Sequence, residues 1–232
     1  MIPKKIHYCW FGHGEKPALA QKCIESWKKY CPDYEIIEWN EDNFDMDYNE
    51  YVRYCYENKK WAFLSDFVRL VVIYEQGGIY FDTDVEVIRS FDELIKESAF
   101  FGFENNEHVA TGLGFGAISG HPTVLQMIKE YDFFSPAEPE VKSCPGLNTQ
   151  ALVKMGLIPN GQLQKVAGSI ILPKDYLNPY DDPTGRLQKT KNTYSIHWYA
   201  KSWISRSAIL RSKLTKPFHR IFGVDCFKWL KK

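Results

Sequence analysis

The feature that most constrains the fold is a helical pattern that runs almost directly into a strand. Apolar residues recur at helical spacing from Phe63 to Tyr74, which predicts an amphipathic helix of about three turns. Gly77-Gly78 predicts its end, because glycine is favoured just beyond a helix C-terminus. Ile79-Tyr80-Phe81 then predicts a strand that leads straight into Asp82-Thr83-Asp84. This succession predicts a helix and a strand side by side, with two carboxylates at the strand's end.

The rest of the chain predicts an α/β domain. A strand over 6–11, a helix over 17–30 and a strand over 34–39 form the strand–helix–strand unit that typically opens a parallel sheet. The composition, 44% hydrophobic and 25% charged over 232 residues, is that of a folded protein and excludes disorder and collagen. We expect an irregular loop over 178–192, and further elements at 99–103, 114–118, 169–172 and 194–198 (strands) and at 121–131 and 147–155 (helices).

Cysteine spacing and hydropathy predict a cytoplasmic protein. The six cysteines form no C-x-x-C pair and no zinc-type spacing, which favours reduced thiols. The N-terminus lacks the apolar segment of a secretory signal. No stretch of the sequence approaches the ~20 apolar residues that a membrane span requires.

Two pairs of charged residues carry the candidate chemistry. Asp82 and Asp84, two apart at a strand end, can share one divalent cation, and their oxygen donors favour Mg²⁺ or Mn²⁺ over zinc. Asp66 and Arg69 lie at i, i+3 and so face the same way on the preceding helix. The alternative interpretations are a solvated strand end for the first group and a minor surface ion pair for the second.

Together these motifs resemble a known family. The segments Ser65-Asp66-x-x-Arg69, Gly77-Gly78-Ile79-Tyr80 and Asp82-Thr83-Asp84 resemble the signature of the D-x-D glycosyltransferases of family 32, as do residues 2–12 and 31–35. Yeast-type mannosyltransferases, bacterial capsule and exopolysaccharide transferases and, more distantly, clostridial glucosylating toxins share it. The resemblance implies a GT-A fold over 1–203, with a Rossmann-like, mostly parallel central sheet flanked by helices.

The resemblance also implies a donor site for a nucleotide-sugar and a metal ion, Mn²⁺ or Mg²⁺. Asp84 would bind the metal directly, and Asp82 would contact the metal shell and the donor ribose. Asp66 and Arg69 would hold the donor sugar, with Arg69 also near the diphosphate. Ser65 would help to place the nucleotide.

Three further residues are matched with alternatives left open. Trp10 matches the aromatic on which the base stacks in the toxin relatives, which favours a UDP-sugar; the alternative is core packing. The segment Ser195 to Trp203 resembles the family's late His-x-x-x-x-Ser-Trp segment. His197 would then be a metal or diphosphate ligand, or else a histidine at the core edge, and Trp203 would cover the donor.

The sequence gives the least information about the residues that would bind the acceptor. Glu104 follows a predicted strand where such folds present acceptor-side residues, although a polar loop is the alternative. The family is regarded as retaining, and Glu104 is the candidate nucleophile if the route is covalent. Further acceptor candidates are Asn105, Asn148 and Thr149.

The C-terminal region is basic. From Ala200 onward it holds nine Lys and Arg against one acid, Asp225, interleaved with large apolar residues. This pattern predicts that 204–232 is a basic amphipathic tail on an anionic membrane surface. The alternative is a pair of helices packed on the domain. Nucleic acid is not expected as a partner, because no known binding module accompanies the charge.

The predicted function is metal-assisted, retaining transfer of a sugar to a growing surface polysaccharide or lipid-linked glycan. The absence of an N-terminal anchor favours a bacterial enzyme on the inner face of the cell membrane over a Golgi enzyme. The alternatives are a transferase acting on a protein side chain, a nucleotide-sugar hydrolase, and a catalytically inert glycan-binding module.

Overall fold

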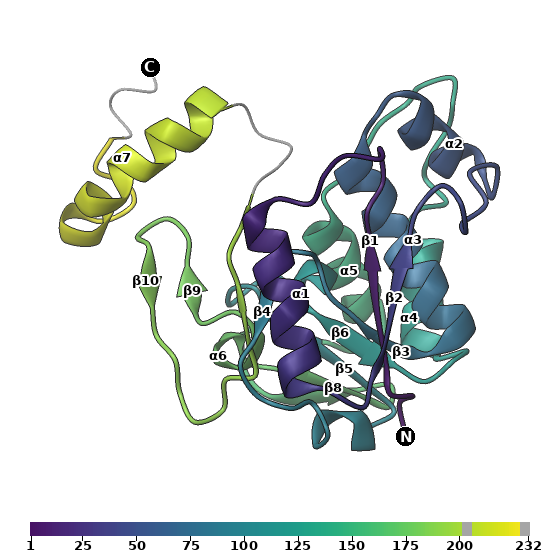
Figure 1. Ribbon diagram of the computed structural model, residues 1–232, viewed down its shortest axis with the longest axis horizontal. Coiled ribbons are helices and arrows are strands. Elements are labelled where there is room, and N and C mark those ends of the chain that lie inside the picture. Colours follow the sequence, from purple (N-terminus) through teal and green to yellow (C-terminus); the bar gives the residue numbers. More distant parts are fainter. Residues whose placement is uncertain (201–205, 228–232) are drawn as a thin grey trace.

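A seven-stranded mixed sheet forms the centre of the molecule. The computed structural model describes residues 1–200 and 206–227 (Figure 1). The strands of the sheet are β1 (Lys5–Cys9), β2 (Glu35–Trp39), β3 (Gly78–Tyr80), β5 (Ala99–Gly102), β6 (Phe115–Ala117), β7 (Gln164–Val166) and β8 (Ser169–Leu172). Their order is β2-β1-β3-β6-β5-β8-β7, and all run in one direction except β6 and β7. The predicted, mostly parallel sheet is confirmed.

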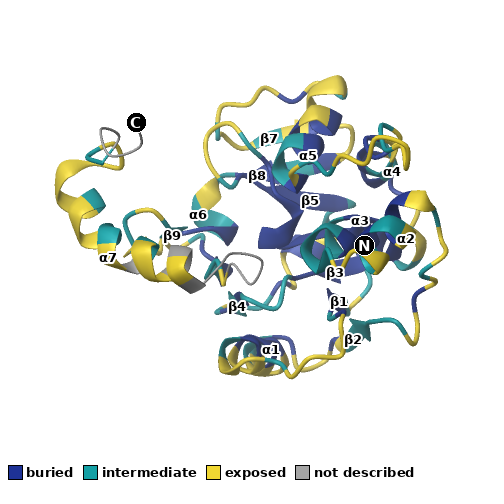
Figure 2. Ribbon diagram, turned by 90° about the horizontal axis from the view of Figure 1, so that it is seen from above, coloured by how far each residue is buried: buried dark blue, intermediate teal, exposed yellow. Residues whose placement is uncertain are grey.

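Helices cover both faces of the sheet, as Figure 2 shows. Side chains alternate along the strands, which sends Ile6 and Tyr8 to the core beneath helix α1 and Cys9 to the opposite core. The two cores give a three-layer α/β/α architecture. The covering helices are α1 (Ala18–Tyr30) on one face and α2 (Glu50–Glu57), α3 (Trp61–Gln76), α4 (Pro122–Lys129) and α5 (Cys144–Lys154) on the other.

The glycine pair after α3 allows the chain to turn directly from that helix into β3. Gly77, at φ 66°, ends the helix with its N–H donating to the Ile73 carbonyl at 2.9 Å. Gly78 has φ 119°, and a Cβ there would lie 2.8 Å from Nε2 of His7. That nitrogen donates to the Gly77 carbonyl at 2.9 Å, and Nδ1 of His7 accepts the Trp39 indole N–H at 3.0 Å. His7 is therefore a buried neutral imidazole that locks β1 to the helix end.

The D-x-D segment lies where the chain leaves the central sheet. After β3 the chain passes through Asp82-Thr83-Asp84 into β4 (Val85–Val87), which pairs antiparallel with β11 (Ser195–His197) in a separate two-stranded sheet. The register places His197 opposite Val85. A strand from more than a hundred residues further along the chain is thus fixed beside the acidic motif.

Some elements differ from the sequence prediction. Helix α5 begins at Cys144, earlier than predicted, because Pro145 is well tolerated in a first helical turn. Strand β7 was not predicted. The segment 178–192, predicted to be irregular, contains the hairpin of β9 (Tyr180–Asp181) and β10 (Arg186–Leu187), preceded by the short helix α6 (Lys174–Leu177). Gly185, at φ 66°, provides its left-handed turn residue.

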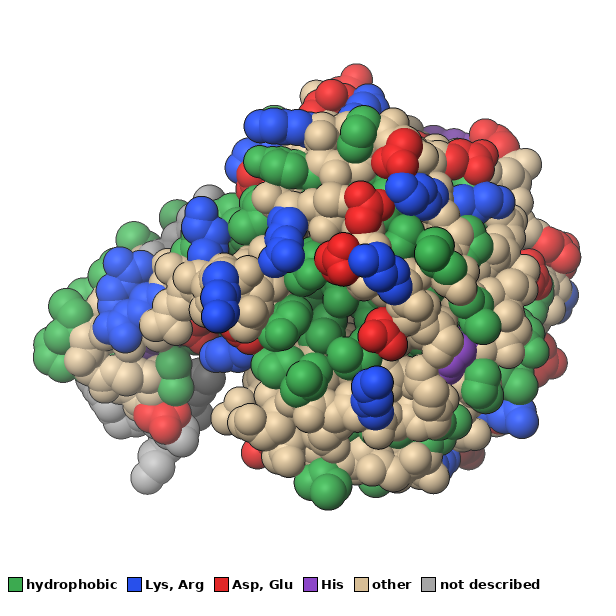
Figure 3. Space-filling model, turned by 90° about the horizontal axis from the view of Figure 1, so that it is seen from below, with side chains coloured by type: hydrophobic (Ala, Val, Ile, Leu, Met, Phe, Trp, Pro, Cys, Tyr) green, Lys and Arg blue, Asp and Glu red, His purple; other side chains and the backbone are tan. Residues whose placement is uncertain are grey.

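Helix α7 (Arg206–Phe222) projects from the body beside the β9–β10 hairpin (Figures 1 and 3). It contacts the hairpin through polar groups: Lys216 Nζ donates to the Tyr180 hydroxyl at 2.9 Å and to Asp182 at 3.1 Å. The predicted boundary at 203/204 lies outside the described residues. Among the residues that are described, none of the helices is both long enough and apolar enough to span a membrane.

Candidate active site

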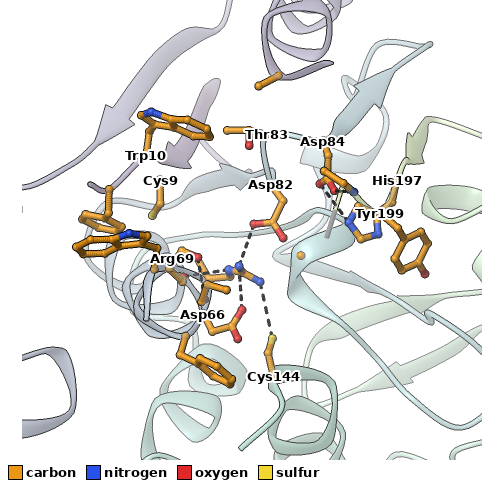
Figure 4. A pocket seen from close by; sticks show the side chains of 18 of the residues that line it. Cys9, Trp10, Asp66, Arg69, Asp82, Thr83, Asp84, Cys144, His197 and Tyr199 are labelled. Atoms are coloured by element: carbon orange, nitrogen blue, oxygen red, sulfur yellow. Dashed lines mark hydrogen bonds and ion pairs between the residues drawn. The ribbon is translucent and has the colours of Figure 1, made fainter. Parts of the chain in front are cut away.

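A cavity of 910 Å³ opens at the carboxyl ends of β1 and β3 and is bordered by the first turns of α3 and α5 (Figure 4). The carboxyl edge of an α/β sheet is the usual ligand-binding edge. Most of the candidate residues from sequence meet there. Those lining the cavity are Trp10, Ser65, Asp66, Arg69, Asp82, Asp84, Glu104 and His197.

Asp82, Asp84 and His197 form a cluster suited to a metal ion. Their ligand atoms lie within 4.8 Å of one another, with His197 Nε2 3.2 Å from Asp84 Oδ1. The backbone N–H of Ala200 donates to Asp84 Oδ2 at 2.6 Å, which holds the carboxylate in place. His197 Nδ1 is buried with no hydrogen-bond partner within the described chain. Two carboxylates and an imidazole fit a divalent ion such as Mn²⁺ or Mg²⁺.

The electrostatics distinguish the two aspartates. Burial opposes ionisation of Asp84, but His197 and the Ala200 N–H outweigh it and hold the pKa of Asp84 below its usual value. At Asp82 burial prevails over the attraction of Arg69, so the pKa is raised. Burial lowers the pKa of His197, but neighbouring Asp84 outweighs it and the net shift is upward. Of the two, Asp84 is thus the carboxylate whose ionised form the fold favours more strongly.

Arg69 links helix α3 to the acidic motif. It is only 3% exposed, and its Nη2 lies 2.9 Å from both Asp66 Oδ1 and Asp82 Oδ1. Nε donates to the Ser65 carbonyl at 3.1 Å, whereas the partner of Nη1 is the Cys144 thiol at 3.8 Å, a weak acceptor. Burial, opposed by Arg69, raises the pKa of Asp66 to about 6. The alternative of a minor surface ion pair is excluded by this burial.

Several site residues were not identified from sequence. The Tyr80 hydroxyl donates to Asp82 Oδ1 at 3.0 Å. Gly112 packs directly on the same carboxylate, and any Cβ there would overlap Asp82 Oδ2. Trp61 and Cys144 also line the cavity. Gly112 lies in the glycine-rich segment 111–114, and Tyr80 belongs to the family signature, so the sequence contained a signal for both. No sequence pattern indicated that Trp61 or Cys144 would line the site.

Tyr199 was also missed, and it connects the metal cluster to Glu104. Its ring centroid lies 4.1 Å from that of His197, and its hydroxyl donates to Glu104 Oε1 at 3.2 Å. Asn178 Nδ2 donates both to this hydroxyl, at 2.7 Å, and to the Glu104 carbonyl, at 3.0 Å. Tyr199 adopts φ 52°, a left-handed conformation that is strained for a non-glycine residue. The chain after β11 is therefore bent so that this side chain reaches Glu104.

The position of Trp10 is consistent both with core packing and with a role in stacking a nucleobase. The side chain is half-buried and packs against the core beneath α1, yet it also lines the cavity together with Trp61. Its indole N–H donates to the Gly14 carbonyl at 2.6 Å, which fixes the ring. Two indoles therefore contribute aromatic surface to the wall near the end of β1.

Three further candidates, Asn105, Asn148 and Thr149, do not line the cavity. Asn105 is exposed, and its Oδ1 accepts the N–H groups of Glu107 and His108 at 2.8 and 2.9 Å. Asn148 is buried, with Nδ2 donating to Thr111 and Cys144. Thr149 donates to the Pro145 carbonyl and accepts the Val109 N–H. These contacts are structural and give no support to the acceptor predictions. Trp203 lies outside the described residues.

Comparison with known proteins agrees with this geometry. Residues 17–101 match the family described as the glycosyltransferase sugar-binding region containing the DXD motif. That stretch includes α3 and the complete acidic motif. Over these residues the chain is similar to the DXD glycosyltransferases. The resemblance inferred from sequence is confirmed.

Two curated relatives and one solved structure extend the comparison. The chain is 31% identical over 145 residues to inositol phosphoceramide mannosyltransferase 3 of Schizosaccharomyces pombe, covering 58% of this chain and 38% of the relative. It is 30% identical over 129 residues to subversion of eukaryotic traffic protein A of Legionella pneumophila, covering 44% of this chain and 20% of that protein. It thus spans well under half the length of these relatives.

The PaToxG glycosyltransferase structure superimposes with a TM-score of 0.51 at 18% identity, covering 66% of this chain and 69% of the other. This likeness concerns the fold alone, which is the GT-A architecture predicted from the sequence.

Proposed function

We propose that this protein is an active, metal-dependent DXD glycosyltransferase that transfers a sugar from a nucleotide-sugar to a hydroxyl of a glycan with retention of configuration. The observation that carries the proposal is the presence, in one cavity, of the Asp82–Asp84–His197 cluster and the buried Arg69. An inert glycan-binding protein would have no chemical need to bury these charges beside one another.

Several residues of the site would stabilise the negative charge of the departing nucleoside diphosphate. A divalent ion held by Asp82, Asp84 and His197 would supply positive charge where negative charge develops. Arg69 adds a fixed guanidinium whose Nη1, with only a thiol as its partner among the described residues, has donor capacity for a phosphate oxygen. Asp66 and Asp82 fix the orientation of that guanidinium through Nη2. Preorganised charge of this kind is commonly the largest catalytic contribution.

For the donor, Trp10 and Trp61 offer the aromatic surface that would stack a nucleobase, with a UDP-sugar favoured by the resemblance of Trp10. Ser65 and Asp66 follow Trp61 and precede Arg69 in the sequence of α3 and line the same cavity, where they would contact the ribose or the sugar.

For the acceptor, Glu104 is the carboxylate that we assign to the reacting hydroxyl or, if the route is covalent, to the anomeric carbon. Tyr199 and Asn178 hold it against the cavity. We propose a surface polysaccharide or lipid-linked glycan as acceptor. The name of the S. pombe relative specifies a lipid acceptor, inositol phosphoceramide. The free cysteines accord with a cytoplasmic site of action.

The test is a panel of UDP-, GDP- and CDP-sugars with Mn²⁺, Mg²⁺ or EDTA, measured by thermal shift and by donor hydrolysis. A true donor stabilises the native state by about 2.7 kcal/mol at a hundred times its dissociation constant. We expect one nucleotide class to raise the melting temperature only with metal, and slow hydrolysis of that donor. Asp82→Asn combined with Asp84→Asn serves as the control that should abolish both effects.

The same panel separates the alternatives. Glycan binding without any stabilisation or hydrolysis by nucleotide-sugars would establish the inert module instead. Hydrolysis that no glycan acceptor accelerates, together with label transfer to protein substrates, would establish a transferase acting on protein side chains. The anomeric configuration of a transferred sugar, read by NMR, decides retention.

A further inference from the structure

Helix α7 contacts the rest of the described protein with its polar side. Lys216 bonds to Tyr180 and Asp182, and His219 Nδ1 lies 3.1 Å from the Pro183 carbonyl. Arg220 donates to the carbonyls of Thr184 and Gly185 at 3.2 and 2.9 Å. Each of these contacts is made to the β9–β10 hairpin. A helix that packs on a domain normally buries its apolar side, so this orientation is reversed.

The opposite side of α7 is apolar and exposed. Leu210, Leu214, Phe218 and Ile221 recur at helical spacing and form one stripe, with 50% to 73% of each side chain exposed. Phe222, next to the stripe, is 68% exposed. We refer to these five residues as the α7 stripe. Contiguous apolar surface on a folded protein usually marks an interaction site, whereas scattered exposed residues need no explanation.

The charge around the α7 stripe is predominantly positive, with Asp182, which Lys216 contacts, and Asp225 as the nearby acids. Residues 183–224 contain nine Lys and Arg and no Asp or Glu. Arg211 and Arg220 are exposed on the helix, and Arg186 is exposed on the adjoining hairpin. Figure 3 shows Lys and Arg side chains beside hydrophobic ones on this lobe of the molecule. An apolar stripe flanked by bases complements a surface that is negatively charged outside and apolar just beneath.

We propose that the α7 stripe binds the surface of an anionic lipid bilayer, with the helix lying along the headgroup region. The apolar side chains would enter the acyl boundary while the flanking bases meet the lipid phosphates. The hairpin contacts through Lys216 and Arg220 would then connect the catalytic body to the membrane. This arrangement suits a transferase whose acceptor is lipid-linked, but it rests on the helix alone and not on the proposed activity.

A second copy of the chain is the competing occupant of the α7 stripe. Two such helices packed face to face would bring two predominantly basic regions together, and the nearby acids, Asp182 and Asp225, are too few to offset the nine bases of residues 183–224. Like charges juxtaposed across an interface oppose association. The charge therefore favours the lipid surface over self-association.

The test is co-sedimentation of the full chain with vesicles of phosphatidylglycerol and phosphatidylcholine in equal parts, or of phosphatidylcholine alone, at low and high salt. The test variant combines Leu210→Ser, Leu214→Ser and Phe218→Ser, which leaves the bases and the hairpin contacts unchanged. Its matched control combines Val153→Ser, Ile158→Ser and Leu163→Ser, exposed apolar residues elsewhere on the protein.

We expect the wild type and the control to bind the anionic vesicles and the α7 variant to bind them at least about tenfold more weakly. Arg211→Glu should weaken binding to anionic vesicles by about fivefold and leave phosphatidylcholine binding unchanged. Equal binding by wild type and the α7 variant would overturn the proposal. So would a lipid-free dimer, seen by light scattering, that the α7 variant dissociates.

A second variant does not depend on the folding of the serine mutant. Leu214→Trp keeps the stripe apolar and places a fluorophore in it. With vesicles containing brominated phosphatidylglycerol, its emission, after subtraction of the wild-type signal, should shift to the blue and be quenched. Unchanged emission from protein that sediments with the vesicles would show that another surface makes the contact.

Discussion

Arg69 Nη2 and Asp82 Oδ1 lie 2.9 Å apart and join helix α3 to the D-x-D segment. The same nitrogen also lies 2.9 Å from Asp66 Oδ1, so one buried cation is shared by two partly buried carboxylates at the edge of the candidate metal cluster. Removing one partner of such a group leaves buried charge uncompensated, which is far costlier than losing a surface pair. Arg69 therefore serves both the fold and the proposed reaction.

Arg69→Lys should impair both roles. Lysine keeps the charge but lacks the planar fork, so it cannot hold Asp66 and Asp82 while presenting a further N–H to the donor. We expect donor turnover to fall by about 10²-fold and the free energy of unfolding by about 1–3 kcal/mol. Urea unfolding and the hydrolysis assay measure the two effects.

Arg53→Lys is the matched control, because Arg53 is an exposed arginine that also has an acidic partner, Asp47. It should change neither quantity appreciably. A stable Arg69→Lys protein with wild-type turnover would contradict the roles assigned to the guanidinium.

Asp84→Asn tests the metal cluster with the shape of the side chain retained. Because His197 and the Ala200 N–H keep Asp84 ionised, the substitution removes the anionic ligand that the fold stabilises most. Turnover should fall by at least about 10²-fold, and Mn²⁺ binding followed by electron paramagnetic resonance should weaken in parallel. Circular dichroism should be unchanged.

The exposed substitution Glu25→Gln removes the same charge elsewhere and should have no such effect. Wild-type activity of Asp84→Asn at limiting Mn²⁺ would remove Asp84 from the metal site.

Sequence patterns predicted the part of the site that is formed by residues close together in the sequence. The apolar spacing of α3, the glycine pair and the strand after it place Asp66, Arg69 and Asp82 within some twenty residues of sequence. Their meeting follows from one helix, one turn and one strand, so the periodicity was sufficient to predict it.

The rest depends on pairing between distant segments. His197 reaches Asp84 only through the β11–β4 register, and the antiparallel direction of β6 has no local signal. Tyr199 depends on one left-handed backbone position. Conversely, Asn148 and Thr149 have the residue types of a binding site but satisfy internal groups, a distinction that only the packed structure makes.

Tyr199→Phe should identify Tyr199 as a positioning residue for Glu104. The change removes one hydroxyl, the group that joins Asn178 to the Glu104 carboxylate, and leaves the ring against His197. The loss of about 1 kcal/mol of hydrogen bonding predicts a roughly fivefold lower kcat with an unchanged KM for the donor. Steady-state kinetics with a saturating acceptor measures this separation.

Tyr48→Phe, at an exposed tyrosine, is the control. If Tyr199→Phe lowers the melting temperature while leaving kcat intact, the tyrosine only supports the fold.

The buried His7 predicts a loss of stability in mild acid. Burial lowers the pKa of His7 to about 4, despite its bond to the Gly77 carbonyl, against about 6.5 in the unfolded chain. Between these values the unfolded state binds more protons, so the stabilising contribution present above pH 6.5 is lost as the pH falls towards 4. A difference of about 2.5 units corresponds to at most about 3 kcal/mol. Urea unfolding at steps from pH 7 to pH 4 should show this slope.

His7→Gln cannot titrate, so its stability, although lower at pH 7, should fall less steeply over the same range. His13→Gln, at an exposed histidine, should retain the wild-type slope. NMR titration of the His7 imidazole in the wild type provides a measurement that does not depend on the variant folding, with a midpoint expected near 4. A midpoint near 6.5, or identical slopes for all three proteins, would show that Trp39 and Gly77 do not hold the ring neutral.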